Sequence, residues 1–103
     1  MSQRIIAIDQ STSSTKALLF DDQCRLLART NVDHQQYYPQ TGWVEHDAEE
    51  IYRNMVEAIH QLVGDEAKTS QHTYSIAITN QRETAVVWNK TTGHPIANAV
   101  VWP

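Results

Sequence analysis

The segment Asp9–Lys16 combines a carboxylate, five consecutive hydroxyl side chains and a cation. A tight turn between strands aims backbone N–H groups and hydroxyls at an anion, and Asp9 could hold a magnesium ion through its water shell. The segment has no Gly-x-x-x-x-Gly-Lys pattern, and the first glycine of the chain is Gly42, so a Walker-type loop is excluded. The alternative is a turn whose hydroxyls bond only to their own backbone, which composition alone favours.

A second polar segment, Asn80–Thr84, directly follows a short apolar run. Arg82 offers a fork of hydrogen-bond donors and Glu83 offers acceptors, which together match the adjacent hydroxyls of a small polyol. An ordinary salt-bridged loop explains the same two residue types about equally well. Further along, Trp88 or Trp102 could present an apolar face to the carbon chain of such a ligand, although tryptophans more often serve packing.

Three strands are predicted around the first polar segment. The apolar runs Ile5–Ile8 and Ala17–Phe20 are typical of strands covered on both faces, so both should lie centrally in a sheet. From Arg25 onward the pattern alternates, which predicts a half-exposed strand. The short turn Asp21–Gln23 favours antiparallel neighbours, so the three strands should form a meander. One face of the third strand would carry Leu26, Ala28, Thr30 and Val32.

One helix is predicted after a loop that contains Pro39 and Gly42. Asp47 can cap this helix and Glu50 can supply the reciprocal contact of a capping box, so the helix should begin at about Ala48. Apolar residues then recur at helical spacing and form a stripe that faces the sheet, before a glycine placed to end the helix. The stripe is Ile51, Met55, Ile59, Leu62 and Val63, and the glycine is Gly64.

Strands are also predicted after the helix. Ser75–Thr79 should be a short buried strand, reached by a crossover and therefore parallel to its neighbour. Ala85–Trp88 and Ile96–Trp102 should form a trailing hairpin, since a turn rich in polar residues separates them. The pattern β-β-β-α-β plus this hairpin indicates an α/β fold with a mixed sheet.

The segment Gly42–Asp47 leads into the predicted helix. It is interpreted as a structural loop, in which Trp43 and Val44 cover the start of the helix and Asp47 caps it. No catalytic role is assigned to it.

Length and composition limit the classes of protein to which the chain can belong. The 103 residues suffice for one domain, and 41% hydrophobic with 19% charged residues is a globular balance. The net charge of −4, without a cluster of Lys or Arg, argues against nucleic acid as a partner. Cys24 is the only cysteine and the apolar run near the N-terminus is too short for a signal peptide or a membrane span, so a cytoplasmic protein with no membrane partner is predicted.

The histidines lack the spacing of a helical metal motif and are interpreted as surface or structural residues: His34, His46, His60, His72 and His94.

Three segments in order resemble the glycerol kinases of the FGGY carbohydrate kinase family. Ile8–Thr12 is similar to the first phosphate segment of that family, Gly42–Asp47 to its pre-helix loop and Ile78–Thr84 to its polyol-binding segment. Three motifs in the correct order are more specific than any one of them. The resemblance implies an actin-like ATPase (ribonuclease H-like) fold and transfer of the γ-phosphoryl group of ATP to a terminal hydroxyl of glycerol, with Mg²⁺ bridging the phosphates.

The resemblance also implies roles for single residues. Arg82 and Glu83 would bind glycerol hydroxyls, and Trp102 would pack on the carbon chain. The residues that would serve the nucleotide and the metal are Thr12, Ser13 and Ser14 for phosphate, Lys16 where these kinases usually carry an arginine, and Asp9 for the metal.

Two residues depart from the family pattern, and both lie in the phosphate segment. Ser11 occupies a position that is usually glycine, which bears on the backbone conformation there. Lys16 keeps the charge of the usual arginine but loses its bidentate fork.

The resemblance places residues 1–103 in the first part of the first kinase domain. It puts the general base and the adenosine pocket further downstream, so the chain alone is expected to be inactive and, with an uncovered sheet edge, to form homo-oligomers. A kinase for another polyol or a pentulose, or a non-catalytic domain with the same fold, remains open as an alternative.

Overall fold

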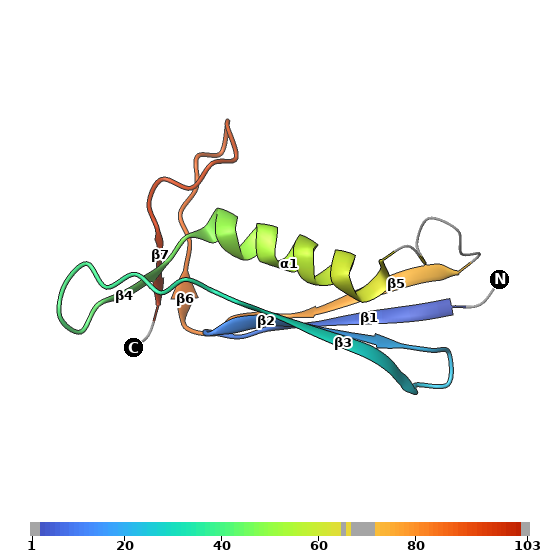
Figure 1. The fold of residues 1–103 in the computed structure, drawn as a ribbon. Coiled ribbons are helices and arrows are strands. Elements are labelled where there is room, and N and C mark those ends of the chain that lie inside the picture. The colour runs from blue at the N-terminus through green and yellow to red at the C-terminus, as the bar shows by residue number, and fades with distance from the viewer. Residues whose placement is uncertain (1–2, 65, 67–71, 102–103) are drawn as a thin grey trace.

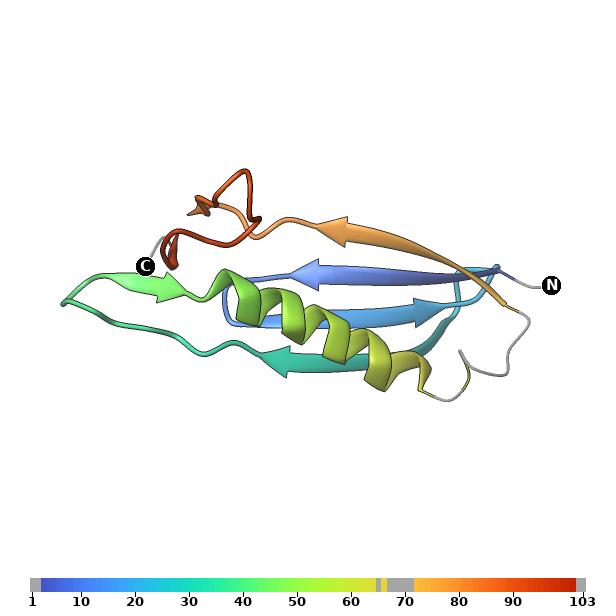
Figure 2. The ribbon, with the colours of Figure 1, turned by 90° about the horizontal axis from the view of Figure 1, so that it is seen from above.

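Four strands form a mixed sheet that carries one long helix on a single face (Figure 1, Figure 2). This computed structural model describes residues 3–64, 66 and 72–101. β2 pairs antiparallel with β1 and β3, whereas β5 pairs parallel with β1, so the predicted meander and the predicted parallel crossover are confirmed. The strands are β1 (Gln3–Gln10), β2 (Ser14–Phe20), β3 (Leu26–Asp33) and β5 (Thr73–Thr79), in the order β3-β2-β1-β5.

Helix α1 (Ala48–Val63) begins and ends where the sequence predicts. The Asp47 side chain accepts a hydrogen bond of 3.0 Å from the backbone N–H of Glu49, and Gly64 ends the helix at φ +46°. The predicted capping box is wrong, because the Glu50 carboxylate accepts from the backbone N–H of Gln35 at 2.7 Å. The first turn of α1 therefore holds the loop that follows β3.

The core lies between α1 and the inner strands of the sheet. Figure 2 shows α1 running over β2 and β3, and the hydroxyl of Thr30 on β3 donates to the carbonyl of Ala58 on α1 at 2.9 Å. The side chains that α1 and the sheet bury together are apolar and include Ile6, Ile8, Ala17, Leu19, Ala58 and Leu62.

The outer strand β5 is not buried, which corrects the prediction for Ser75–Thr79. Ile78 is paired with Ile8 across the parallel ladder, yet Ile78 is 62% exposed and Ile8 only 1%. The reason is position: α1 covers β2 and β3, and it leaves β5 uncovered at the other edge of the sheet. The apolar run indicated a strand correctly, but it could not show that none of the residues described by the structure covers that strand.

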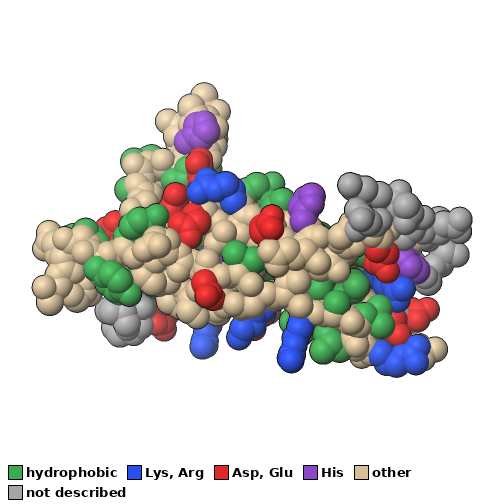
Figure 3. All heavy atoms as spheres, viewed as in Figure 1, with side chains coloured by type: hydrophobic (Ala, Val, Ile, Leu, Met, Phe, Trp, Pro, Cys, Tyr) green, Lys and Arg blue, Asp and Glu red, His purple; other side chains and the backbone are tan. Residues whose placement is uncertain are grey.

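The face of the sheet opposite α1 is exposed and carries basic side chains. Lys and Arg side chains project from it below the strands (Figure 3). Lys16 on β2 is exposed and shares this face with Arg29, because the ladder pairs Lys16 with Asn31 and Leu18 with Arg29.

A second, three-stranded sheet stands beyond the N-terminal end of α1, in the order β4-β7-β6 (Figure 1). Its strands are β4 (Val44–His46), β6 (Thr84–Ala85) and β7 (Ala99–Val101). β4 lies inside the segment Gly42–Asp47, which was predicted as a loop, and Trp43 is 53% exposed and so does not cover the helix start as predicted. β4 is too short for its alternation to be recognised in sequence.

The predicted hairpin is present with shorter strands. Only Thr84–Ala85 and Ala99–Val101 form ladder strands, in place of the predicted Ala85–Trp88 and Ile96–Trp102. The hairpin continues through a bridge between Trp88 and Pro95 and through the bond from Ile96 N–H to the Val87 carbonyl, at 2.9 Å. Pro95 has no N–H to donate, which interrupts the ladder there. Trp102 lies outside the described residues.

Candidate functional site

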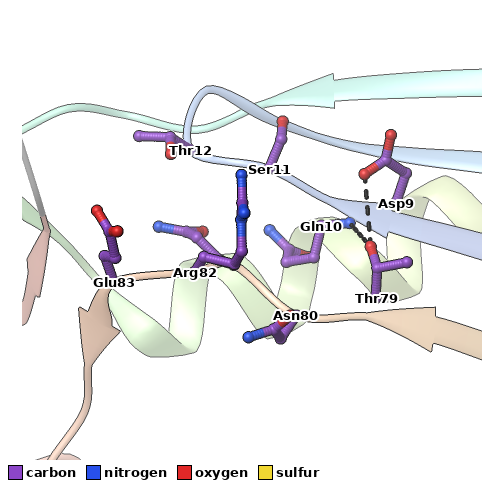
Figure 4. Close-up of a pocket in the computed structure, with 9 residues that line it drawn as sticks. Asp9, Gln10, Ser11, Thr12, Thr79, Asn80, Arg82 and Glu83 are labelled. Atoms are coloured by element: carbon purple, nitrogen blue, oxygen red, sulfur yellow. Dashed lines mark hydrogen bonds between the residues drawn. The ribbon is translucent and has the colours of Figure 1, made fainter.

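The two polar segments meet because β1 and β5 run parallel and end at the same edge of the sheet. Asp9 near the end of β1 is paired with Thr79 at the end of β5. The Thr79 hydroxyl also accepts from the Gln10 backbone N–H at 3.2 Å and so links the two strand ends (Figure 4). Between the segments lies a cleft of about 520 Å³, lined by Asp9, Gln10, Ser11, Thr12, Thr79, Asn80, Gln81, Arg82 and Glu83.

The turn between β1 and β2 is closed by Ser11. Its backbone N–H and its hydroxyl both donate to the carbonyl of Ser14, at 3.0 and 2.9 Å. Among the described residues other than glycine, only Cys24 and Glu83 have positive φ, so Ser11 needs no glycine-like conformation. The alternative of a self-bonded hydroxyl turn therefore holds for Ser11.

The other residues predicted for phosphate lie at different depths. Thr12 and Ser13 are exposed at the tip of the turn, and of these two Thr12 lines the cleft. Ser14 is buried at the start of β2 and offers its carbonyl to Ser11. Lys16 points to the sheet face opposite α1 and does not line the cleft, although its backbone is paired with Asp9. The structure thus brings Asp9 and Thr12 together with Arg82 and leaves Lys16 aside.

Asp9 is the carboxylate nearest the predicted phosphate turn. One of its oxygens lies 3.4 Å from the Thr79 hydroxyl, and the side chain is exposed to the cleft. The described residues contain no group of three or more His, Cys, Asp or Glu side chains that could hold a metal ion. A single carboxylate fits Mg²⁺, which usually keeps several waters and takes its remaining ligands from substrate phosphates.

Arg82 and Glu83 form the second wall of the cleft. Figure 4 shows both side chains rising from their turn on the side of Ser11 and Thr12, whereas Asn80 points away. Within residues 3–64, 66 and 72–101, the side chains of Arg82 and Glu83 make no ion pair and no hydrogen bond, so the salt-bridged loop is not what forms here. Their donors and acceptors are free to bind a ligand.

Glu83 sits at φ +56°, in the left-handed region. A residue with a β-carbon pays a conformational cost there that glycine does not, and such residues cluster at functional sites. The sequence did not reveal this conformation, since Glu is not a usual left-handed residue.

Replacing Glu83 with glycine should therefore raise the free energy of unfolding of the chain by about 1 kcal/mol, because the left-handed strain is relieved. Arg82→Gly is the matched control: Arg82 is equally exposed but has no positive φ, so its replacement should lower stability. Urea denaturation measures both, and a loss of stability in Glu83→Gly would contradict the strain.

A group of buried and half-buried polar residues adjoins the cleft, and sequence reasoning missed it. His34, 7% exposed, follows β3; its Nδ1 accepts from Asn54 Nδ2 of α1 at 3.0 Å, and its Nε2 lies 2.7 Å from the Gln10 amide. His46 on β4 is fully buried, and its ring centroid lies 5.9 Å from that of His34. Its ring nitrogens contact Gln36 and Gln81. We call these residues the histidine network: Gln10, Thr15, His34, Gln36, His46, Asn54 and Gln81.

Burial lowers the pKa of both histidines below the ordinary value of 6.5. For His34, the charges of Glu50 and Asp33 raise the pKa and offset part of that effect. For His46, the neighbouring His34 lowers the pKa further, while Glu50 raises it. Both rings are therefore neutral near pH 7, each with one donor and one acceptor nitrogen.

The stability that neutral His34 and His46 contribute should be fully present above pH 6.5 and lost as the pH falls from 6.5 towards their lowered folded-state pKa values. In that window the unfolded chain binds more protons than the folded chain. Urea unfolding between about pH 7.5 and 5 should show the decline. His94→Asn, which removes an exposed histidine, should keep it, whereas pH-independent stability of the wild-type chain would contradict the assignment.

Comparison with known proteins agrees with this fold. Residues 4–103 match the N-terminal domain of the FGGY family of carbohydrate kinases. Glycerol kinase 1 of Thermotoga maritima is 49% identical over 98 residues, which cover 95% of this chain and 20% of that protein. The glycerol kinase of Pseudarthrobacter chlorophenolicus is 48% identical over 102 residues, or 99% of this chain and 20% of that protein. The chain belongs to the FGGY family of carbohydrate kinases.

Solved structures give the same fold. Plasmodium falciparum glycerol kinase with ADP superposes with a TM-score of 0.83 at 37% identity, covering 98% of this chain and 20% of that one. A xylulose kinase from Rhodospirillum rubrum reaches 0.84 at 19% identity, over 95% and 20%, which is a likeness of fold alone. The expected α/β fold of the actin-like ATPases is confirmed. The chain spans about one fifth of the length of these relatives.

No helix in the described part of the chain is both long and apolar enough to cross a membrane.

Proposed function

We propose that this chain supplies the polyol-binding wall and part of the phosphate cradle of an ATP-dependent glycerol kinase. The observation that carries the proposal is the placement of the unpaired Arg82 and Glu83 across one cleft from the turn of Ser11 and Thr12. A phosphoryl acceptor and a phosphoryl donor must lie that close for transfer. The relatives named glycerol kinase, at 44–49% identity, favour glycerol as the acceptor.

Each proposed contact follows from the chemistry of the side chain. The guanidinium of Arg82 can donate two parallel hydrogen bonds to neighbouring glycerol oxygens, and the carboxylate of Glu83 can accept from two hydroxyls. Trp102, the residue after Val101 in the sequence, would pack on the carbon chain. On the other wall, Thr12 and Ser13 would contact phosphate, with Ser14 and Lys16 behind them.

The reaction breaks the bond between the γ-phosphorus of ATP and its bridging oxygen and forms a bond to a terminal oxygen of glycerol. ADP leaves with the electron pair, and the hydroxyl proton passes to a general base. Mg²⁺, when bound, neutralises charge on the phosphates, and Asp9 is the residue that would hold it through water. Sequence resemblance puts the base and the adenosine pocket outside this chain.

The proposal for domain organisation is supported by the match of residues 4–103 to the N-terminal domain of the family. Residues 1–103 would be the N-terminal part of the first kinase domain, and a second domain would close over the cleft. Without it, water would screen the contacts of Arg82 and Glu83, so the chain alone should bind weakly and not catalyse transfer. A location in the cytoplasm is consistent with ATP and glycerol as small-molecule substrates.

Arg82→Ala in the full-length protein should raise the Michaelis constant for glycerol about tenfold or more, because it removes donors worth about 1–3 kcal/mol to a partly desolvated ligand. A coupled ADP-release assay with glycerol, ATP and magnesium measures this. Arg29→Ala, on β3 and outside the cleft, is the matched control and should leave the constant unchanged.

An unchanged glycerol constant in Arg82→Ala would reject the polyol assignment. ADP release that depends on a pentulose or a longer polyol, but not on glycerol, would show that the protein is a kinase with a different substrate.

A further inference from the structure

A continuous series of hydrogen bonds runs under the cleft from its phosphate wall to its polyol wall. Gln36 Nε2 donates to the backbone carbonyl of Thr12 at 3.2 Å. Gln36 Oε1 lies 2.7 Å from His46 Nε2, and His46 Nδ1 lies 3.0 Å from Gln81 Nε2. His46 is the residue at which the two halves meet.

The carbonyl of Thr12, at one end of this series, determines which atom donates and which accepts in each of the following bonds. The carbonyl of Thr12 can only accept, so the amide of Gln36 must present its nitrogen there and its oxygen to His46. That oxygen requires a proton on His46 Nε2, which leaves Nδ1 as the acceptor in the neutral ring. Gln81 Nε2, which is a donor, then donates to Nδ1 at 3.0 Å.

Gln81 has few other contacts to hold it. Its Nε2 makes one further bond, to the Thr84 hydroxyl at 3.0 Å, and that hydroxyl in turn donates to the Arg82 carbonyl at 3.2 Å. Its Oε1 is buried and has no hydrogen-bond partner among the described residues. The bond to His46 therefore ties the turn that carries Arg82 and Glu83 to the buried part of the molecule.

We propose that His46 is a positioning residue that fixes both walls of the cleft, the turn of Arg82 and Glu83 through Gln81 and the turn of Thr12 through Gln36. The inference rests on the proposed function, since it deepens the account of the same cleft. His46 does not line the cleft, so it would touch neither ligand. It is fully buried, and its two ring nitrogens serve two different walls.

Two substitutions at His46 separate its two contacts. In His46→Asn the side-chain oxygen takes the place of Nδ1, so the contact to Gln81 is kept and the contact to Gln36 is lost. In His46→Gln the side-chain nitrogen takes the place of Nε2, so the contact to Gln36 is kept and the contact to Gln81 is lost. A residue that only fills space would not distinguish the two contacts in this way.

The experiment measures both Michaelis constants in the full-length protein and hydrogen–deuterium exchange of the two turns. His46→Gln should raise the constant for glycerol about fivefold and speed exchange in residues 80–84, with the constant for ATP little changed. His46→Asn should do the reverse, raising the constant for ATP and speeding exchange in residues 10–14. His94→Asn, at an exposed histidine, should change none of these values.

Equal effects of both variants on both constants and on both turns, or no effect of either, would overturn the positioning role. If the His46 variants do not fold, Gln81→Met removes the same contact from the other end and should reproduce the effect of His46→Gln; unchanged exchange in residues 80–84 of that variant would overturn the proposal. The exchange measurement needs no turnover. A wild-type protein that does not phosphorylate glycerol, yet shows the two separate exchange changes, would reject the proposed function and support the positioning role.

Discussion

The parallel pairing of β1 with β5 is the constraint on which the candidate site depends. Strands that run in the same direction end at the same edge of a sheet, and the register that pairs Asp9 with Thr79 sets the two following turns side by side. An antiparallel β5 would carry Arg82 and Glu83 to the far end of the sheet. The crossover through α1 makes the parallel pairing accessible, and the packing of α1 on β2 and β3 holds the meander in place.

The two turns need a second constraint, because each is exposed and only loosely held by its own contacts. The histidine network supplies it from below. Burial of a neutral imidazole costs little free energy when both of its nitrogens are hydrogen-bonded. A protonated His46 would instead place an N–H at Nδ1 opposite the donor Nε2 of Gln81. The lowered pKa of His46 and the orientation of Gln36 are thus parts of one arrangement, in which the floor of the cleft keeps its shape near neutral pH.

Sequence patterns predicted the parts of this arrangement that local chemistry controls. The apolar runs located β1 and β2, and Asp47 with Gly64 located α1 to the residue. What sequence could not show depends on tertiary contacts. The exposure of β5 depends on what α1 leaves uncovered, β4 exists because β7 pairs with it, and the reach of Glu50 to Gln35 replaces a local capping contact. His34 continues the alternation of Ala28, Thr30 and Val32, which was the one signal that it faces inward.

The cleft itself can be tested directly by titrating glycerol into the isotopically labelled chain and following backbone amide shifts by NMR. The account predicts shifts confined to residues 79–84 and the facing turn of Ser11 and Thr12, saturating weakly, in the millimolar range or above, because water has access to the open cleft. The amide chemical shifts of β3, at the opposite edge of the sheet from β5, should not change. Shifts that gather elsewhere, or no shift of Arg82 and Glu83 at any glycerol concentration, would contradict the assignment of this cleft as a polyol site.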